Sequence, residues 1–243
     1  YAIELCLVGS EMCRRDSFNS VFEDTLDAMF SAPKKTFHSS DSFRQMLETN
    51  FQKRHLVHLS SGRTVPLHNA CLWIVVRGMV RLGALTEQGD ELMLGLAGPN
   101  ESFGEPLSNV PAFEATTLSD CDLLCIPFQE IHDSPGLAKD LLSTVMLRQR
   151  QATNLLALVG LRRIEERVRG FLELLAVDYG QPCELGLRLP VRLTHQDMAN
   201  ALSTTRVTVT RIIGQLKDEG WLLLDQQRHL VMTHPKQSVH RKH

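Results

Sequence analysis

The chain has 243 residues, with 26 basic and 28 acidic side chains and a formal net charge of −2. This length can bury a sizeable core, and 43% hydrophobic with 22% charged residues is ordinary for a globular protein. The near-neutral balance excludes a chain coated in basic residues, so any DNA binding must depend on local clusters of Lys and Arg. No apolar run reaches the roughly 20 residues of a membrane span. We therefore expect a cytoplasmic protein with no membrane partner, and its six cysteines, which lack a close CxxC spacing, should be reduced.

The first fifty residues contain two stretches with helical spacing of apolar side chains. Residues 17–30 and residues 39–51 each place Phe, Leu, Met or Val at intervals of three and four. This spacing predicts two amphipathic helices. We therefore assign residues 1–50 to an N-terminal helical extension.

Residues 51–134 change in character. Short apolar runs alternate with turn residues such as Gly62, Gly78 and Gly83 and with the sequence Gly98-Pro-Asn. Several short strands at this spacing are typical of an all-β sandwich or barrel. The runs lie at residues 56–57, 72–76, 79–82, 92–96 and 123–126. We expect this segment to form a β-barrel that acts as an effector or sensor domain.

Residues 135–160 contain the longest predicted helix, from residue 137 to residue 159. Its apolar residues recur at steps of four, seven, three and four, and Arg148 occupies the gap. A stripe with this spacing is typical of a seam between two packed helices, so we predict a dimerisation helix and a homodimer. The predicted seam consists of Leu141, Val145, Ala152, Leu155 and Val159.

Residues 161–243 predict a winged helix-turn-helix domain. A helix over residues 162–179 and a short strand over residues 187–191 precede two short helices and a terminal hairpin. Thr194 and Asp197 have the spacing of a capping box, with Asp in place of Glu, at the start of the first short helix. The second short helix is expected from Thr205 to about Asp218. The chain as a whole is predicted to be α+β, with a β-barrel, a long helix and this winged domain.

The second short helix has two different faces. One face is apolar and carries Val209, Ile212, Ile213 and Leu216. The other offers hydrogen-bond donors and a methyl-bearing group to base edges, as a recognition helix in the DNA major groove requires. These candidate base-reading residues are Arg206, Val207, Thr210 and Arg211. An alternative is that two short helices joined by a tight turn bind another protein or a ligand instead of DNA.

Residues 193–217, LTHQDMANALSTTRVTVTRIIGQLK, resemble the CRP/FNR family of bacterial regulators. Weaker similarity runs through LWIVVRG at residues 72–78 and through Phe103-Gly104-Glu105, so the resemblance covers roughly residues 50–235. Within the family, STTRVTVTR at residues 203–211 is most similar to the cyanobacterial nitrogen-control regulators. The resemblance implies a cyclic-nucleotide-binding-like jelly roll, a homodimer on double-stranded DNA, and RNA polymerase as a partner.

The resemblance also assigns roles to residues of the second short helix. Arg206 and Arg211 correspond to family arginines that contact bases, usually guanine. Val207 stands where cyclic-AMP-responsive members carry a Glu, and a valine cannot accept a hydrogen bond from cytosine N4. The half-sites should therefore differ from theirs, and a GTA-type palindrome is expected. The residues expected to hold DNA phosphates are Gln196, Thr205 and Thr208.

The predicted sensor departs from the family's cyclic-nucleotide pocket. That pocket uses a Gly-Glu pair followed, roughly ten residues later, by an Arg-Ser pair. Gly104 and Glu105 are present, but residues 108–117 contain no Arg or Lys, so a cyclic phosphate would lack a cationic partner. We therefore expect no dependence on cyclic AMP.

Arg148 resembles the arginine with which the nitrogen-control regulators bind 2-oxoglutarate on the long helix. The second basic ligand of that site, expected near residues 111–117, is missing. The alternative is that Arg148 forms an ion pair with a carboxylate such as Glu105, because an unpaired charge in an apolar seam is costly. A regulator that needs no effector and a regulator gated by a small dicarboxylate both remain open.

Other cofactors and enzymatic activity find no support in the sequence. Cys6 and Cys13 are too few and too far apart for the family's iron–sulfur cluster. Single histidines such as His55, His58 and His68 could in principle hold haem but are more often structural. The chain has no Gly-rich phosphate loop, no Gly-x-Ser-x-Gly, no His-Glu-x-x-His and no paired cysteine ligands. We therefore predict no enzyme, no metal and no cofactor.

Overall fold

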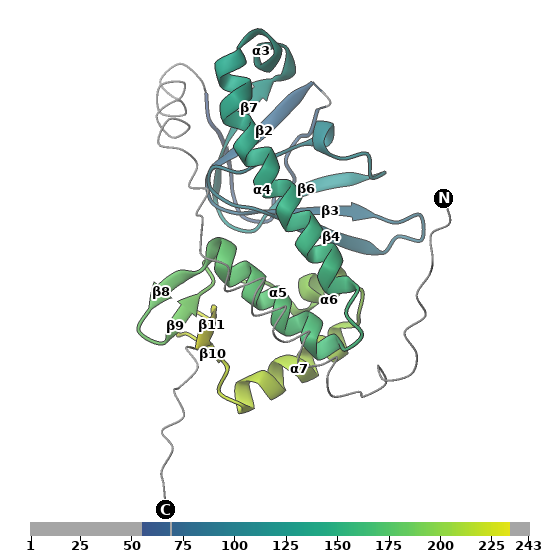
Figure 1. Ribbon diagram of the computed structural model, residues 1–243, viewed down its shortest axis with the longest axis vertical. Coiled ribbons are helices and arrows are strands. Elements are labelled where there is room, and N and C mark those ends of the chain that lie inside the picture. The colour runs from purple at the N-terminus through teal and green to yellow at the C-terminus, as the bar shows by residue number, and fades with distance from the viewer. Residues whose placement is uncertain (1–54, 69, 234–243) are drawn as a thin grey trace, which may run out of the picture. The chain divides into compact units, whose positions relative to one another are not determined.

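The computed structural model describes residues 55–68 and 70–233, so the helices predicted at residues 17–30 and 39–51 lie outside the described residues. Two antiparallel sheets form a β-roll in the first half of the described chain (Figure 1). The first sheet has the order β1 (Val57–Leu59), β7 (Cys121–Pro127), β2 (Cys71–Arg77), β5 (Ser102–Phe103). The second has the order β4 (Glu91–Ala97), β3 (Val80–Leu85), β6 (Phe113–Thr117).

Strand β2 is buried on both faces, which explains its continuous apolar run. Trp73 and Val75 face the interior of the β-roll, where they join buried residues of β3, β6 and β7. Leu72 and Ile74 face the other way and pack with the helical residues Leu137 and Leu141. A strand covered on two sides loses the alternation of a half-exposed strand.

A long helix follows the β-roll after the short helix α3 (Phe128–Asp133), whereas the short 3-10 helix η1 (Glu105–Leu107) lies earlier, between β5 and β6. Helix α4 (Pro135–Val159) begins with Pro135 in its first turn, and the Ser134 side chain accepts a hydrogen bond from the Leu137 backbone N–H. Helix α5 (Ile164–Tyr179) returns against the end of α4. A Cβ atom added at Gly170 would lie 2.5 Å from Leu158 Cδ2, so any larger residue there would require the Leu158 side chain to shift.

The C-terminal part combines two short helices with a second small sheet. Helices α6 (His195–Ala201) and α7 (Arg206–Asp218) pack together. The sheet has the order β10 (Leu222–Leu224), β11 (Leu230–Thr233), β9 (Gly186–Arg188), β8 (Gln181–Cys183). Gly186 has a φ of +145°, and a Cβ there would lie 1.9 Å from the Met232 carbonyl oxygen. The predicted α+β architecture of β-roll, long helix and winged helix-turn-helix is confirmed.

The structure changes some details of the predicted elements. The strand predicted at residues 187–191 is shorter, and β9 forms a hairpin with β8, which was not predicted. Strand β6 falls in a segment where no strand was predicted. Among the residues described, no helix combines the length and the hydropathy that crossing a membrane would require.

Candidate nucleic-acid interface

Helix α6 begins with the predicted capping box. The Thr194 hydroxyl oxygen accepts a hydrogen bond from the Asp197 backbone N–H at 3.0 Å, and the Asp197 carboxylate accepts one from the Thr194 backbone N–H at 2.9 Å. The Thr194 hydroxyl also donates to the same carboxylate at 2.6 Å. Met198, Ala199 and Ala201 form the buried face of the helix. These contacts fix where α6 starts and which side faces the core.

A tight turn carries the chain from α6 to α7. Ser203 has a φ of +50° in this turn, and Thr205 caps α7 by accepting a hydrogen bond from the Thr208 backbone N–H at 3.2 Å. The apolar face of α7 is buried, as predicted, and consists of Val209, Ile212, Ile213 and Leu216. Burial of this face fixes the rotation of α7 about its axis, so the opposite face points outward.

The outward face of α7 presents the predicted base-reading residues together. Arg206, Val207, Thr210 and Arg211 are all exposed, and 80% of Val207 is accessible. Two guanidinium groups, a hydroxyl and an apolar side chain therefore share one side of a single helix. This arrangement can enter a DNA major groove without any rearrangement of the core.

The predicted phosphate-contacting residues lie at the N-terminal ends of the two helices. Thr205 and Thr208 share a hydrogen bond of 2.9 Å between their hydroxyl groups. Gln196 is exposed on α6 and donates a hydrogen bond to the Asn200 side chain at 2.7 Å. Their use in DNA binding stays a prediction.

His195 belongs to the same surface and was not singled out from the sequence. Its Nδ1 lies 2.8 Å from the Thr210 hydroxyl, which itself donates to the Arg206 carbonyl oxygen. Because the hydroxyl proton is used, His195 Nδ1 must be the donor. Burial lowers the pKa of His195, and the nearby charges of Lys217 and Arg206 lower it further. The position of His195, directly after the N-cap residue and beside Gln196, was the available signal.

The wing hairpin is held to the rest of the sheet by Arg188 of β9. Its Nε donates to the Asp225 carboxylate at 2.6 Å, and its Nη2 donates to Gln227 at 2.8 Å. Burial opposes ionisation of Asp225, but the His229 backbone N–H and the Arg188 guanidinium outweigh it and lower the pKa of Asp225 to about 2. The positive charge of Arg188 is therefore paired with Asp225 inside this small sheet.

Gly104 and Arg148 of the predicted effector site line one cavity of about 400 Å³ between the β-roll and α4. Glu105 does not line this cavity, so the structure brings together two of the three predicted residues. Of the described residues that line it, only Arg148 carries a charge. The apolar lining includes Leu82, Met93, Phe103, Leu107, Val110 and Phe113.

Arg148 does not pair with Glu105 as the alternative prediction had it. Its Nη1 donates to the Leu96 backbone carbonyl on β4 and to the Gln151 side-chain oxygen at 2.9 Å. Gln151 is 5% exposed and also accepts from the Leu96 backbone N–H at 3.0 Å. The sequence did not reveal Gln151, because a single polar residue in a long helix does not show which neighbour it meets.

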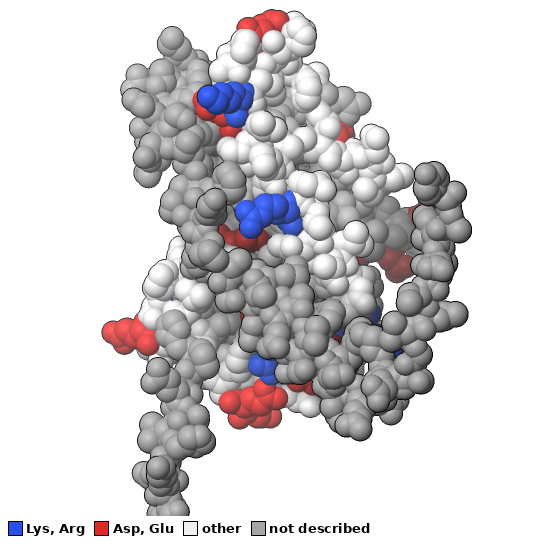
Figure 2. All heavy atoms as spheres, viewed as in Figure 1, with Lys and Arg blue, Asp and Glu red and all other residues white. Residues whose placement is uncertain are grey.

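The predicted dimer seam lies only partly on the surface, because two of its five residues are buried within the single chain. Leu141 and Leu155 are buried within this chain, at 3% and 7% exposure, and Leu141 belongs to the core shared with β2 and β7. Val145, Ala152 and Val159 are half-buried or exposed. The residues that α4 leaves exposed at heptad spacing are Leu142, Met146, Gln149, Thr153 and Leu156. The visible surface along α4 is mostly uncharged (Figure 2).

Two known domains match this architecture. The cyclic nucleotide-binding domain matches residues 68–133, and the Crp-like helix-turn-helix domain matches residues 166–237. The regulatory protein CysR of Synechococcus elongatus is 31% identical over 185 residues, which cover 75% of this chain and 85% of that protein. The global nitrogen regulator of Nostoc sp. is 27% identical over 167 residues, which cover 65% of this chain and 74% of that protein.

Solved structures share the fold. A cyclic nucleotide-binding domain containing protein from Listeria monocytogenes has a TM-score of 0.66 at 17% identity, over 80% of this chain and 98% of its own. A CRP/FNR family transcriptional regulator from Thermus thermophilus has a TM-score of 0.60 at 24% identity, over 74% and 94%. With both domains matched and CysR similar over three quarters of this sequence, the chain belongs to the CRP/FNR family of transcription regulators.

Proposed function

We propose that this regulator binds double-stranded DNA sequence-specifically, as a homodimer on a palindromic site with GTA-type half-sites. One observation carries the proposal: Arg206, Val207, Thr210 and Arg211 share the exposed face of α7, whose opposite face is buried. Arg206 and Arg211 each have the donors to contact guanine, and Val207 offers an apolar contact to a thymine methyl group. A role on bacterial DNA implies a cytoplasmic protein with RNA polymerase as a partner.

The homodimer uses the exposed stripe of α4. Leu142, Met146, Gln149, Thr153 and Leu156 follow each other at steps of four and three, as in a two-stranded coiled coil. Pairing of two copies along this stripe would bury apolar side chains that one chain leaves exposed to water. Leu156, for example, is 73% exposed in the single chain. The two recognition helices of such a dimer meet half-sites about 34 Å apart, which is one turn of DNA.

Cyclic AMP is not needed for binding. Arg148 is the only charged residue among the described residues that line the cavity, and its Nη1 is bonded to Leu96 and Gln151. A cyclic phosphate would lose its water there without gaining a free cationic partner. The second candidate is gating by a small dicarboxylate such as 2-oxoglutarate, with which Arg148 would pair by exchanging its contacts to Leu96 and Gln151 for a carboxylate of the ligand.

Selection from a library of random duplexes tests the proposal. The wild-type protein should enrich a palindrome with half-sites about ten base pairs apart, centre to centre. Enrichment of no sequence would contradict the proposal and favour a role in binding a protein or a ligand. Calorimetry with cyclic AMP and with 2-oxoglutarate tests the effector: tight cyclic AMP binding would contradict independence from cyclic AMP, and 2-oxoglutarate binding would support the second candidate.

A further inference from the structure

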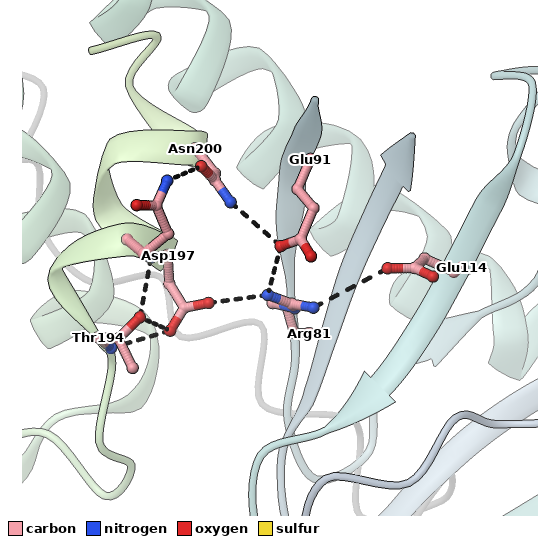
Figure 3. A network of polar contacts seen from close by, with 7 residues as sticks. Arg81, Glu91, Glu114, Thr194, Asp197 and Asn200 are labelled. Atoms are coloured by element: carbon pink, nitrogen blue, oxygen red, sulfur yellow. Dashed lines mark hydrogen bonds and ion pairs between the residues drawn. The ribbon is translucent and has the colours of Figure 1, made fainter. Parts of the chain in front are cut away.

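Arg81 of the β-roll contacts helix α6 of the helix-turn-helix. Its Nη1 donates to the Asp197 carboxylate at 2.9 Å, and the two side chains are only 19% and 9% exposed. Beside this pair, Asn200 of α6 donates to Glu91 of β4 at 3.3 Å. Figure 3 shows Arg81 and Glu91 directed from the strands toward Asp197 and Asn200. Two polar links thus join the β-roll to α6.

The charges at this contact make it depend on Arg81. Besides Asp197, Arg81 lies 3.5 Å from the Glu91 carboxylate and 3.9 Å from the Glu114 carboxylate. Removal of the guanidinium would leave carboxylates of the β-roll facing a carboxylate of α6 with no cation between them. Asp197 is nearly buried, but Glu91 and Glu114 are 51% and 34% exposed, so salt should screen this repulsion in part.

Asp197 is a rigid attachment point because the carboxylate oxygen that does not contact Arg81 is already hydrogen-bonded to Thr194. Asp197 Oδ2 accepts from the Thr194 backbone N–H and hydroxyl, and Oδ1 accepts from Arg81. The capping box therefore fixes the carboxylate to the start of α6. An ion pair to a fixed carboxylate transmits the position of α6 better than a pair to a mobile side chain.

The contact leaves the reading surface open. Arg206, Val207, Thr210 and Arg211 of α7 remain exposed while Arg81 holds the inner side of α6. The link continues through Asn200 to Gln196, which is exposed at the start of α6. The contact therefore orients the helix-turn-helix and does not cover its exposed face.

We propose that Arg81 is a positioning residue for DNA binding, which holds α6 against strands β3 and β4 so that α7 meets the DNA at a fixed orientation. The inference rests on the proposed function, because fixed orientation matters when two recognition helices must match two half-sites together. A helix-turn-helix that is already oriented loses less freedom on binding. Arg81 acts through Asp197 and touches no DNA.

The test compares three duplexes: the palindrome selected by the wild type, the same palindrome with two base pairs added to its spacer, and a single half-site. Arg81→Ala should weaken binding to the palindrome by roughly tenfold. Its affinity for the single half-site should stay at the wild-type value, and its discrimination against the lengthened spacer should fall. Arg77→Ala is the matched control, since Arg77 pairs at 2.7 Å with Asp122, another residue of the β-roll.

Two further variants separate positioning from folding. Arg81→Lys keeps the charge and should recover most of the palindrome affinity. Asp197→Asn keeps an acceptor for Thr194 but loses the charge partner of Arg81, so its effect should not add to that of Arg81→Ala. Equal losses on the palindrome and the half-site, or no loss on either, would overturn the inference. If the wild type selects no palindrome, the proposed function fails first, and the inference fails with it.

Discussion

Tyr179 at the end of α5 donates a hydrogen bond to the Glu101 carboxylate of the β-roll at 2.8 Å. Gln151 of α4 donates to the same phenolic oxygen at 2.6 Å, so three elements meet at this hydroxyl. Burial raises the pKa of Glu101 to about 7, although the Gly98 backbone N–H and the Tyr179 hydroxyl both favour the ionised form. The joint between β-roll, α4 and α5 therefore contains a carboxyl group that titrates near neutral pH.

Replacement of Glu101 by Gln should change how stability depends on pH. The folded-state pKa of about 7 lies above the ordinary value of 4.5, so the folded protein binds the extra proton between these values. Stability then falls as pH rises through this window, by on the order of 3 kcal/mol when complete. Glu101→Gln has no such titration. Between pH 5 and pH 8, the free energy of unfolding of the variant should therefore rise relative to that of the wild type. Urea unfolding at pH 5 and at pH 8 measures this change, and Glu87→Gln, at an exposed position, is the control. An equal change in the free energy of unfolding for both variants would contradict the prediction.

The charge around His195 makes a second prediction. Burial, Lys217 and Arg206 lower the pKa of His195 below its ordinary 6.5. Arg206→Ala removes one of these positive charges, so the pKa of His195 should rise. A titration of the imidazole C–H signals by NMR measures it. Arg211→Ala serves as the control, and a pKa of His195 that is unchanged by Arg206→Ala would show that the two side chains are not neighbours.

The exposed stripe of α4 predicts the oligomeric state. Leu156 is 73% exposed in the single chain, so Leu156→Glu should leave the fold intact and prevent dimerisation by burying a charge in the seam. Sedimentation velocity should show a dimer for the wild type and a monomer for the variant. Thr153→Ser, a conservative change on the same stripe, should remain dimeric. A wild-type monomer, or a dimeric Leu156→Glu protein, would refute pairing along this stripe.

Val207 predicts a change of DNA specificity. Val207→Glu introduces a carboxylate that can accept a hydrogen bond from cytosine N4, so the preferred half-site should shift toward a cytosine at one position. The preference should amount to roughly 1–3 kcal/mol between the two bases. Because 80% of Val207 is exposed, thermal stability should change little. Selection of random duplexes with the variant measures the shift, and an unchanged half-site would place Val207 away from the bases.

Elements with strong local signals were predicted well. Helix α7 follows from the Thr205 cap and the helical spacing of Val209, Ile212 and Leu216, since both signals lie within one stretch of chain. Strand β6, with the sequence FEATT, was missed because Glu114 and Thr116 are only half-buried beside β3. Its placement depends on a neighbour distant in sequence, which no local pattern reveals.

The candidate site divides in the same way. The exposed face of α7 follows from the position of its buried face, so Arg206 and Arg211 could be identified from spacing alone. The partners of Arg81 and Arg148 could not. Arg81 meets Asp197 across 116 positions of sequence, and Arg148 meets a backbone carbonyl, which has no sequence signature at all.

The most direct measurement is the affinity of Arg206→Ala and Arg211→Ala for the palindrome that the wild type selects. Each variant should lose roughly 1–3 kcal/mol of binding free energy, about 5- to 150-fold in Kd, while remaining folded and dimeric. Arg77→Ala, remote from the reading face, should bind like the wild type. Wild-type affinity in both arginine variants would contradict the claim that α7 reads DNA.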